Sequence, residues 1–248
     1  MNRINLLMVF AAGVIGSSFG TLVGGTALIT TPALLLLGLP PHTAIGTNKV
    51  GLMGLASAGW YGFNRKGMIN YRIGLFICLP AVVGSFVGAH LALQIDEALL
   101  KQVIAIITIV ILAFIMVKPN VGIEKSRHNP RKYEYLLGMG FCLLLFIYSG
   151  FYGAGAGTLL SYILILLFRQ TFLESAATRK ISNLASNLMG AMVFAIDGAI
   201  SYLPGTILFA GCFLGSYVGA HFSDKIGNIW IKRLFSVVVL IMAVKLLI

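Results

Sequence analysis

Long stretches without a single charged residue constrain this chain more than any other feature of its sequence. No Asp, Glu, Lys or Arg lies between Arg3 and Lys49, and none lies between Glu134 and Arg169. About 20 apolar residues are enough for a helix to cross the hydrocarbon core of a bilayer. Only 10% of the 248 residues are charged, against about 25% in a soluble domain. The chain is therefore expected to be an all-α integral membrane protein.

The apolar sequence divides into about eight hydrophobic segments. Between the fourth and the fifth lies a longer polar stretch, 118–135, which is expected to be a basic cytoplasmic linker. It separates a first transmembrane repeat, 1–117, from a second one, 136–248. The approximate segments are 6–38, 44–63, 73–93, 99–117, 136–168, 176–196, 202–222 and 231–248.

The formal net charge of +11 could indicate a protein that binds nucleic acid. The basic residues lie instead in short loops between apolar runs, which is the pattern of cytoplasmic loops in membrane proteins. We therefore expect the lipid bilayer as a partner, and no nucleic acid. The three cysteines all lie in apolar runs without a CxxC or Cys/His cluster. They are expected to be packing residues and not metal ligands.

The two halves repeat each other when the chain is shifted by 131 residues. Over positions 47–103 this shift aligns sixteen identical residues among 57. The run Gly84–His90 aligns with Gly215–His221, and Lys49 aligns with Lys180. Such internal repeats are a common plan of membrane transporters.

The first segment of each half is too long for one straight crossing. Segments 6–38 and 136–168 each hold 33 residues, about 50 Å of helix, against a hydrocarbon core of about 30 Å. Each has glycines near its middle, and glycine lets the backbone leave the helix. Both segments are therefore predicted to be broken at their glycine clusters.

The basic residues favour an inverted arrangement of the halves. If each broken segment crosses once, the halves are parallel, and ten basic residues face inward against eight outward. If each segment turns back, the halves are inverted, and the count is fourteen against four, with the N-terminus outside. Cytoplasmic loops carry the excess of Lys and Arg, so inverted repeats are predicted.

Signals for catalysis are missing. Every carboxylate lies at a segment end or in a loop, and the sequence has no phosphate loop, GxSxG or HExxH motif. We expect no enzyme activity, no catalytic residue, no cofactor and no metal site.

The glycine clusters have two interpretations. They can serve close helix packing, or they can mark broken helices whose free N–H groups and positive dipole ends bind an anion near mid-membrane. The second is favoured where the glycines fall at the breaks. The substrate-binding residues predicted there are Gly24, Gly25, Thr26, Gly153, Gly155, Gly157 and Thr158.

Lys49 and Lys180 are the strongest candidates for substrate binding. A charged lysine within a membrane span is energetically costly, and such residues usually have a function. The alternative is that each lysine extends to the lipid headgroups. Polar residues accompany both lysines at helical spacing, where they can either bridge helices or bind an oxyanion. Those predicted to bind substrate are Thr47, Asn48, Ser57, Asn183, Ser186 and Asn187.

These motifs resemble the TauE/SafE family, a group of exporters of sulfite and organosulfur anions. In the first half the resemblance lies in Gly24–Thr26, Thr31–Leu34 and Ala44–Lys49. In the second half it lies in Gly150–Gly157 and Lys180–Asn187. The resemblance covers nearly the whole chain in order. It implies a permease of the bacterial plasma (inner) membrane that moves small anions such as sulfite, sulfonates or thiosulfate.

The residues themselves predict a secondary transporter of a small anionic substrate, with alternating access between the two repeats. Two alternatives stay open. One is a permease for a different organic anion, such as a carboxylate, and the other is a membrane assembly subunit without transport. The sequence also leaves open the direction of transport, the coupling ion and the oligomeric state, with a homodimer among the arrangements considered.

Overall fold

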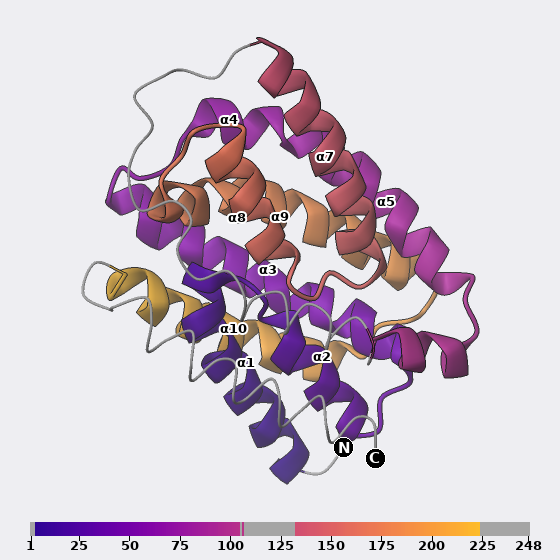
Figure 1. Ribbon diagram of the computed structural model, residues 1–248. Helices are drawn as coiled ribbons and strands as arrows, with labels where there is room; N and C mark the ends of the chain where they lie inside the picture. Colours follow the sequence, from indigo (N-terminus) through magenta and orange to yellow (C-terminus); the bar gives the residue numbers. More distant parts are fainter. Residues whose placement is uncertain (1–2, 105, 107–131, 224–248) are drawn as a thin grey trace.

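The computed structural model describes residues 3–104, 106 and 132–223. Within these residues the fold is built of helices, with no strand (Figure 1). Most of segment 99–117, linker residues 118–131 and the segment 231–248 lie outside the described residues. The helices are α1 (Arg3–Val23), α2 (Ala27–Leu36), α3 (Pro41–Arg65), α4 (Tyr71–Phe76), α5 (Cys78–Leu93), α7 (Lys132–Phe151), α8 (Ala156–Leu166), α9 (Phe172–Ile196) and α10 (Tyr202–His221); residues 97–104 are also helical.

Four helical stretches in the described part of the chain are long and apolar enough to cross a membrane. They are Arg3–Val23, Tyr71–Leu93, Tyr133–Phe151 and Tyr202–His221. The two longest helices, α3 and α9, are more polar and are not among them. Both lie inside the molecule, where α1, α5, α7 and α10 surround them (Figure 1). The apolar helices can therefore face lipid while the polar pair contacts protein.

Local sequence explains where the central helices begin. Helix α3 starts at Pro41, and proline fits the first helical position because its missing N–H has no partner there anyway. Helix α9 starts with a capping box, in which Thr171 and Glu174 each accept a hydrogen bond from the other's backbone N–H.

Both long apolar segments turn back on themselves. In the first, Thr26 donates a hydrogen bond to the Gly16 carbonyl at 3.2 Å, so α2 folds back along α1. In the second, the ring of Phe168 lies 5.4 Å from that of Tyr135, and Arg169 pairs with Glu134. Helix α8 therefore returns to the end where α7 began, and the glycine clusters form the turns.

Helices α3 and α9 cross at the centre in opposite directions. Gly46, near the start of α3, packs on Phe194 near the end of α9. Gly59, near the end of α3, packs on Lys180 near the start of α9. Helices α3 and α9 occupy equivalent positions in the two halves. The equivalent helices of the repeat are therefore antiparallel to each other where they pack together.

The outer helices pack across the halves rather than within them. Helix α1 lies along α10, and its equivalent α7 lies along α5. Glycines make these contacts close, because small residues let helix backbones approach. On α10 three glycines face carbonyl groups of Phe10, Val14 and Ser18 on α1, and they are Gly211, Gly215 and Gly219.

A matched pair of substitutions tests this close packing. A Cβ at Gly88 on α5 would lie 2.7 Å from the Phe151 amide nitrogen of α7, whereas a Cβ at Gly140 would meet nothing within 4 Å. We expect Gly88→Ala to lower the free energy of unfolding by about 1–3 kcal/mol through overpacking. Gly140→Ala should leave it unchanged or raise it by about 0.5–1 kcal/mol. Denaturation in detergent measures both, and equal values would contradict the packing assignment.

Candidate functional site

The breaks of the two halves meet at the centre of the molecule. A Cβ at Gly157, in the first turn of α8, would lie 3.3 Å from the Gly24 Cα. The Thr158 hydroxyl donates a hydrogen bond to the Val23 carbonyl at 2.8 Å. Four glycines at the breaks have positive φ, a region open to glycine but costly for other residues. They are Gly24, Gly25, Gly153 and Gly155.

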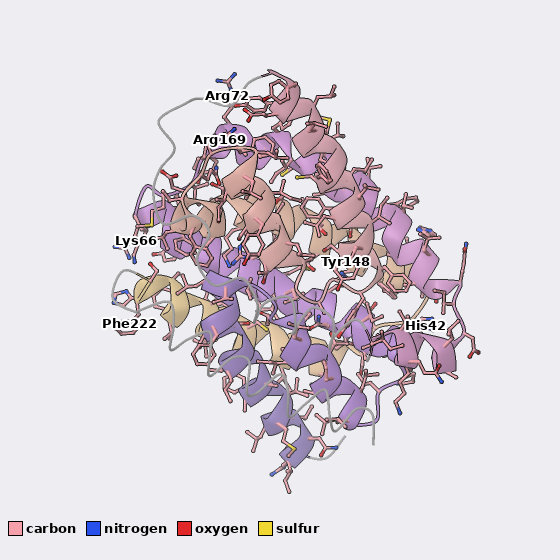
Figure 2. All side chains as sticks on the ribbon, in the orientation of Figure 1. His42, Lys66, Arg72, Tyr148, Arg169 and Phe222 are labelled. Carbon is pink, nitrogen blue, oxygen red and sulfur yellow. The ribbon has the colours of Figure 1, made fainter. Side chains whose placement is uncertain are left out.

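The second break is further held by its own aromatic side chain. The Tyr148 hydroxyl of α7 donates a hydrogen bond to the Ala154 carbonyl at 2.5 Å. Tyr148 is half-buried, and Figure 2 labels it near the end of α7 from which the chain continues to α8. The backbone carbonyl freed by the break thus has a partner, which a membrane interior demands.

A cavity of about 50 Å³ lies where the breaks meet the central helices. A single buried water needs about 10–15 Å³, so the cavity has room for a few waters or one small ion. Its lining residues come from both halves and include no Asp or Glu. They are Gly20, Gly24, Gly25, Thr26, Ala27, Lys49, Leu52, Leu55, Ser149, Gly153, Ala156, Gly157, Arg179, Lys180, Asn183 and Asn187.

The two lysines are buried within the protein and do not extend to the surface. Lys49 is 1% exposed and Lys180 is 0% exposed, and both line the cavity. The Lys49 ammonium donates to the Ser149 carbonyl of α7. The Lys180 Nζ has no hydrogen-bond partner. The headgroup alternative is therefore excluded for both side chains in this conformation.

Each lysine stem lies in a niche provided by the opposite half. A Cβ at Gly59 of α3 would lie 2.7 Å from Lys180 Cε, and one at Gly190 of α9 would lie 3.4 Å from Lys49 Cε. Gly59 and Gly190 are equivalent positions in the repeat. Each half therefore provides the glycine niche that holds the lysine of the other half.

Several predicted residues lie away from the cavity. The Thr47 hydroxyl accepts from the Ser201 N–H at 2.9 Å, and Asn48 Oδ1 accepts from the Thr30 hydroxyl at 2.5 Å. The Ser186 hydroxyl lies 3.4 Å from the Ser149 hydroxyl of α7. These contacts join helices, as the packing alternative expects. The predicted residues outside the lining are Thr47, Asn48, Ser57, Gly155, Thr158 and Ser186.

Arg179 was missed by the sequence reasoning, although it is 1% exposed and lines the cavity. Its guanidinium Nη2 donates to the carbonyls of Thr21 and Leu22 at 2.9 and 2.8 Å, which are end carbonyls of α1. Nη1 donates to the Gly157 carbonyl of α8 at 2.5 Å. The sequence offered one indication of a role for Arg179. It lies next to Lys180, and its equivalent position in the first half is Asn48.

The cavity lining is rich in basic groups and hydrogen-bond donors. Lys49, Arg179 and Lys180 supply three basic groups, the amides of Asn183 and Asn187 add donors, and no lining residue supplies a negative charge. Among the residues that the structure describes, no group of three or more His, Cys, Asp or Glu side chains could hold a metal ion.

A multi-pass helical membrane protein with broken helices around a buried polar cavity belongs to the class of membrane transporters. The chain matches the family model for the sulfite exporter TauE/SafE over residues 9–246, and it belongs to this family.

Relatives of similar length have the same description. A "probable membrane transporter protein" of Haemophilus influenzae is 32% identical, covering 97% of this chain and 94% of the relative. The "probable membrane transporter protein ORF9" of a Sinorhizobium species is 31% identical, covering 98% and 92%. The "probable membrane transporter protein YfcA" of Escherichia coli K12 is 26% identical, covering 97% and 88%. No solved structure matches the chain significantly.

A second matched pair tests the contact between the breaks. Gly24 and Gly38 have nearly the same backbone angle, φ +90° and +89°. A Cβ at Gly24 would lie 2.7 Å from the Gly157 carbonyl carbon and 2.8 Å from Arg179 Nη1, whereas one at Gly38 would meet nothing within 4 Å. We expect Gly38→Ala to lower the free energy of unfolding by about 1–2 kcal/mol through strain. Gly24→Ala should cost about 1–3 kcal/mol more through the clash.

Thermal unfolding of both variants in the same detergent measures the difference. A Gly24→Ala variant no less stable than Gly38→Ala would mean that the two breaks do not touch.

Proposed function

We propose that the protein is a secondary transporter that moves a small anion by alternating access between its two halves. The observation that carries this proposal is the cavity itself, where two equivalent buried lysines meet without a lining carboxylate. A buried ammonium without a counter-charge is unfavourable, and the partner missing at Lys180 is the one that an anion would supply. An assembly subunit has no need of such a site.

We further propose that the two halves are inverted repeats in the membrane. The antiparallel crossing of α3 and α9 and the return of both broken segments support this arrangement. The basic residues support it as well. Lys66, Arg72 and Arg169 are among the fourteen basic residues that this arrangement places on the inner side. In Figure 2 they lie on the opposite side of the view from His42.

For the substrate we propose sulfite or another sulfur oxyanion, moved outward. The support is the description of the family as sulfite exporters. The cavity chemistry fits any small oxyanion, so a carboxylate substrate is the outcome that would redirect this assignment. A panel of sulfite, thiosulfate, a sulfonate and a carboxylate, tested for binding to the purified protein and for flux in proteoliposomes, decides between them. No flux of any of these anions would contradict the transporter proposal.

The inverted arrangement makes a prediction for two equivalent positions. Arg72 and Leu203 each follow the first residue of α4 or α10, differ by 131 in number, and are exposed. Inverted repeats place them on opposite membrane faces, and parallel repeats place them on the same face. We expect an impermeant thiol reagent applied outside intact cells to label Leu203→Cys at once, and Arg72→Cys only after permeabilisation.

The parent protein serves as the control, because Cys142 and Cys212 are buried and Cys78 is partly buried. Labelling of both introduced cysteines from the same side would rule out the inverted arrangement.

Replacement of the lysines tests the binding site. Methionine roughly keeps the length of lysine and removes its charge. We expect Lys180→Met to weaken anion binding by about 1.5–3 kcal/mol, as for the loss of a hydrogen bond to a charged group. Lys180→Arg should retain part of the affinity. Lys49→Met should have the smaller effect, because the Lys49 ammonium already has the Ser149 carbonyl as a partner.

Binding of sulfite to the purified variants, compared with Lys101→Met at an exposed position, gives these values. Unchanged affinity in both Lys49→Met and Lys180→Met would end the site assignment while leaving the transporter class intact.

A further inference from the structure

The side chain of Arg179 connects the two helix breaks. Its guanidinium donates to the Thr21 and Leu22 carbonyls at the end of α1 and to the Gly157 carbonyl at the start of α8. A weaker contact of 3.4 Å reaches the Gly20 carbonyl. One side chain of α9 thus bridges the broken segments of both halves.

This bridge exists on one side of the repeat only. The position equivalent to Arg179 is Asn48, which accepts a hydrogen bond from Thr30 on α2, within its own half. Asn48 is too short to bridge two breaks and is not in the cavity lining. Both halves therefore have an equivalent lysine and an equivalent glycine niche, but only the second half has an arginine that connects the two breaks.

The bridge is made of contacts that an anion can replace. The carbonyls bound by Arg179 are neutral acceptors, whereas an oxyanion carries the opposite charge and can accept two parallel N–H bonds from a guanidinium at once. Arg179 lines the cavity, and its Nε has no partner. An oxyanion beside Lys180 would therefore compete with the carbonyls for the guanidinium.

We propose that Arg179 is a substrate-sensitive latch between the two broken segments. In the empty site it ties the end of α1 to the start of α8 and keeps the halves together at the breaks. When the anion binds, the guanidinium turns from the carbonyls to the anion, and the α1–α2 hairpin is released from α8. Anion binding thereby permits the movement that alternating access requires. This inference rests on the proposed anion transport.

Energy transfer between dyes measures the separation of the linked segments. Ile15 on α1 and Leu166 on α8 are both exposed, so maleimide-linked dyes attached to cysteines there leave the core undisturbed. The background replaces Cys78, Cys142 and Cys212 by serine and is first checked for transport. In this protein we expect sulfite to change the energy transfer. In the Arg179→Gln variant we expect the anion-bound value already without sulfite, and no further change when sulfite is added.

The same variant should separate binding from transport. Because Lys49 and Lys180 remain, and because the guanidinium only exchanges its carbonyl partners for the anion, sulfite affinity should fall less in Arg179→Gln than in Lys180→Met. The transport rate at saturating sulfite should fall by a larger factor, since the latch no longer responds to the anion. Arg65→Gln, at an exposed arginine on α3, is the matched control and should change neither quantity.

Two results would overturn the latch. One is an Arg179→Gln variant that retains both the sulfite-dependent change in energy transfer and the transport rate. The other is a parent protein that binds sulfite without any change in energy transfer, which decides the matter even if Arg179→Gln does not fold. A parent protein that binds none of the tested anions would instead contradict the proposed function, and the latch would fall with it.

Discussion

The need to pair every backbone polar group away from water governs this structure. Lipid offers no hydrogen bonds, so an interrupted helix is tolerated in a membrane only where protein or an enclosed cavity satisfies the freed groups. Here the freed groups are satisfied by a contact between the two interruptions and by a side chain of α9. Thr158 of α8 bonds the Val23 carbonyl at the end of α1, and Arg179 bonds further carbonyls of the same turn. The breaks must therefore lie together, and their meeting point defines the cavity.

The polarity of the central helices follows from the same constraint. Helices α3 and α9 carry the buried lysines and most of the polar residues near the cavity, and neither is apolar enough to be a membrane-length span of the usual kind. The more apolar helices around them cover the faces that carry the lysines, and the exposed side chains of α3 and α9, such as Trp60 and Met192, are mostly apolar or aromatic. A charged side chain has a high free-energy cost on a lipid-facing helix. The cost is lower at the centre of the protein, where the side chain faces a polar cavity.

Helical character, the repeat and the broken segments could be predicted from the sequence, because each follows from local composition or from length against the bilayer. Both breaks fall at the glycine clusters, and Lys49, Lys180, Asn183 and Asn187 line the cavity, while their role in binding substrate stays a prediction. Thr47 and Asn48 lie outside the cavity lining, because their side chains bond Ser201 and Thr30 instead. Arg179 was missed because its partners are backbone carbonyls of other helices, between 22 and 159 residues away in the chain, and a backbone carbonyl leaves no trace in the residue types.

The exchanged lysine niches have a consequence for how such a molecule can originate. Each half contains one lysine and one glycine niche, but Gly59 accommodates Lys180 and Gly190 accommodates Lys49. A chain of half this length would therefore contain a lysine and a glycine niche, but its lysine could not occupy its own niche. Two copies lying antiparallel could complete both niches at once. The pairing seen within this single chain is the geometry that a dimer of half-length ancestors would have required before their genes were fused.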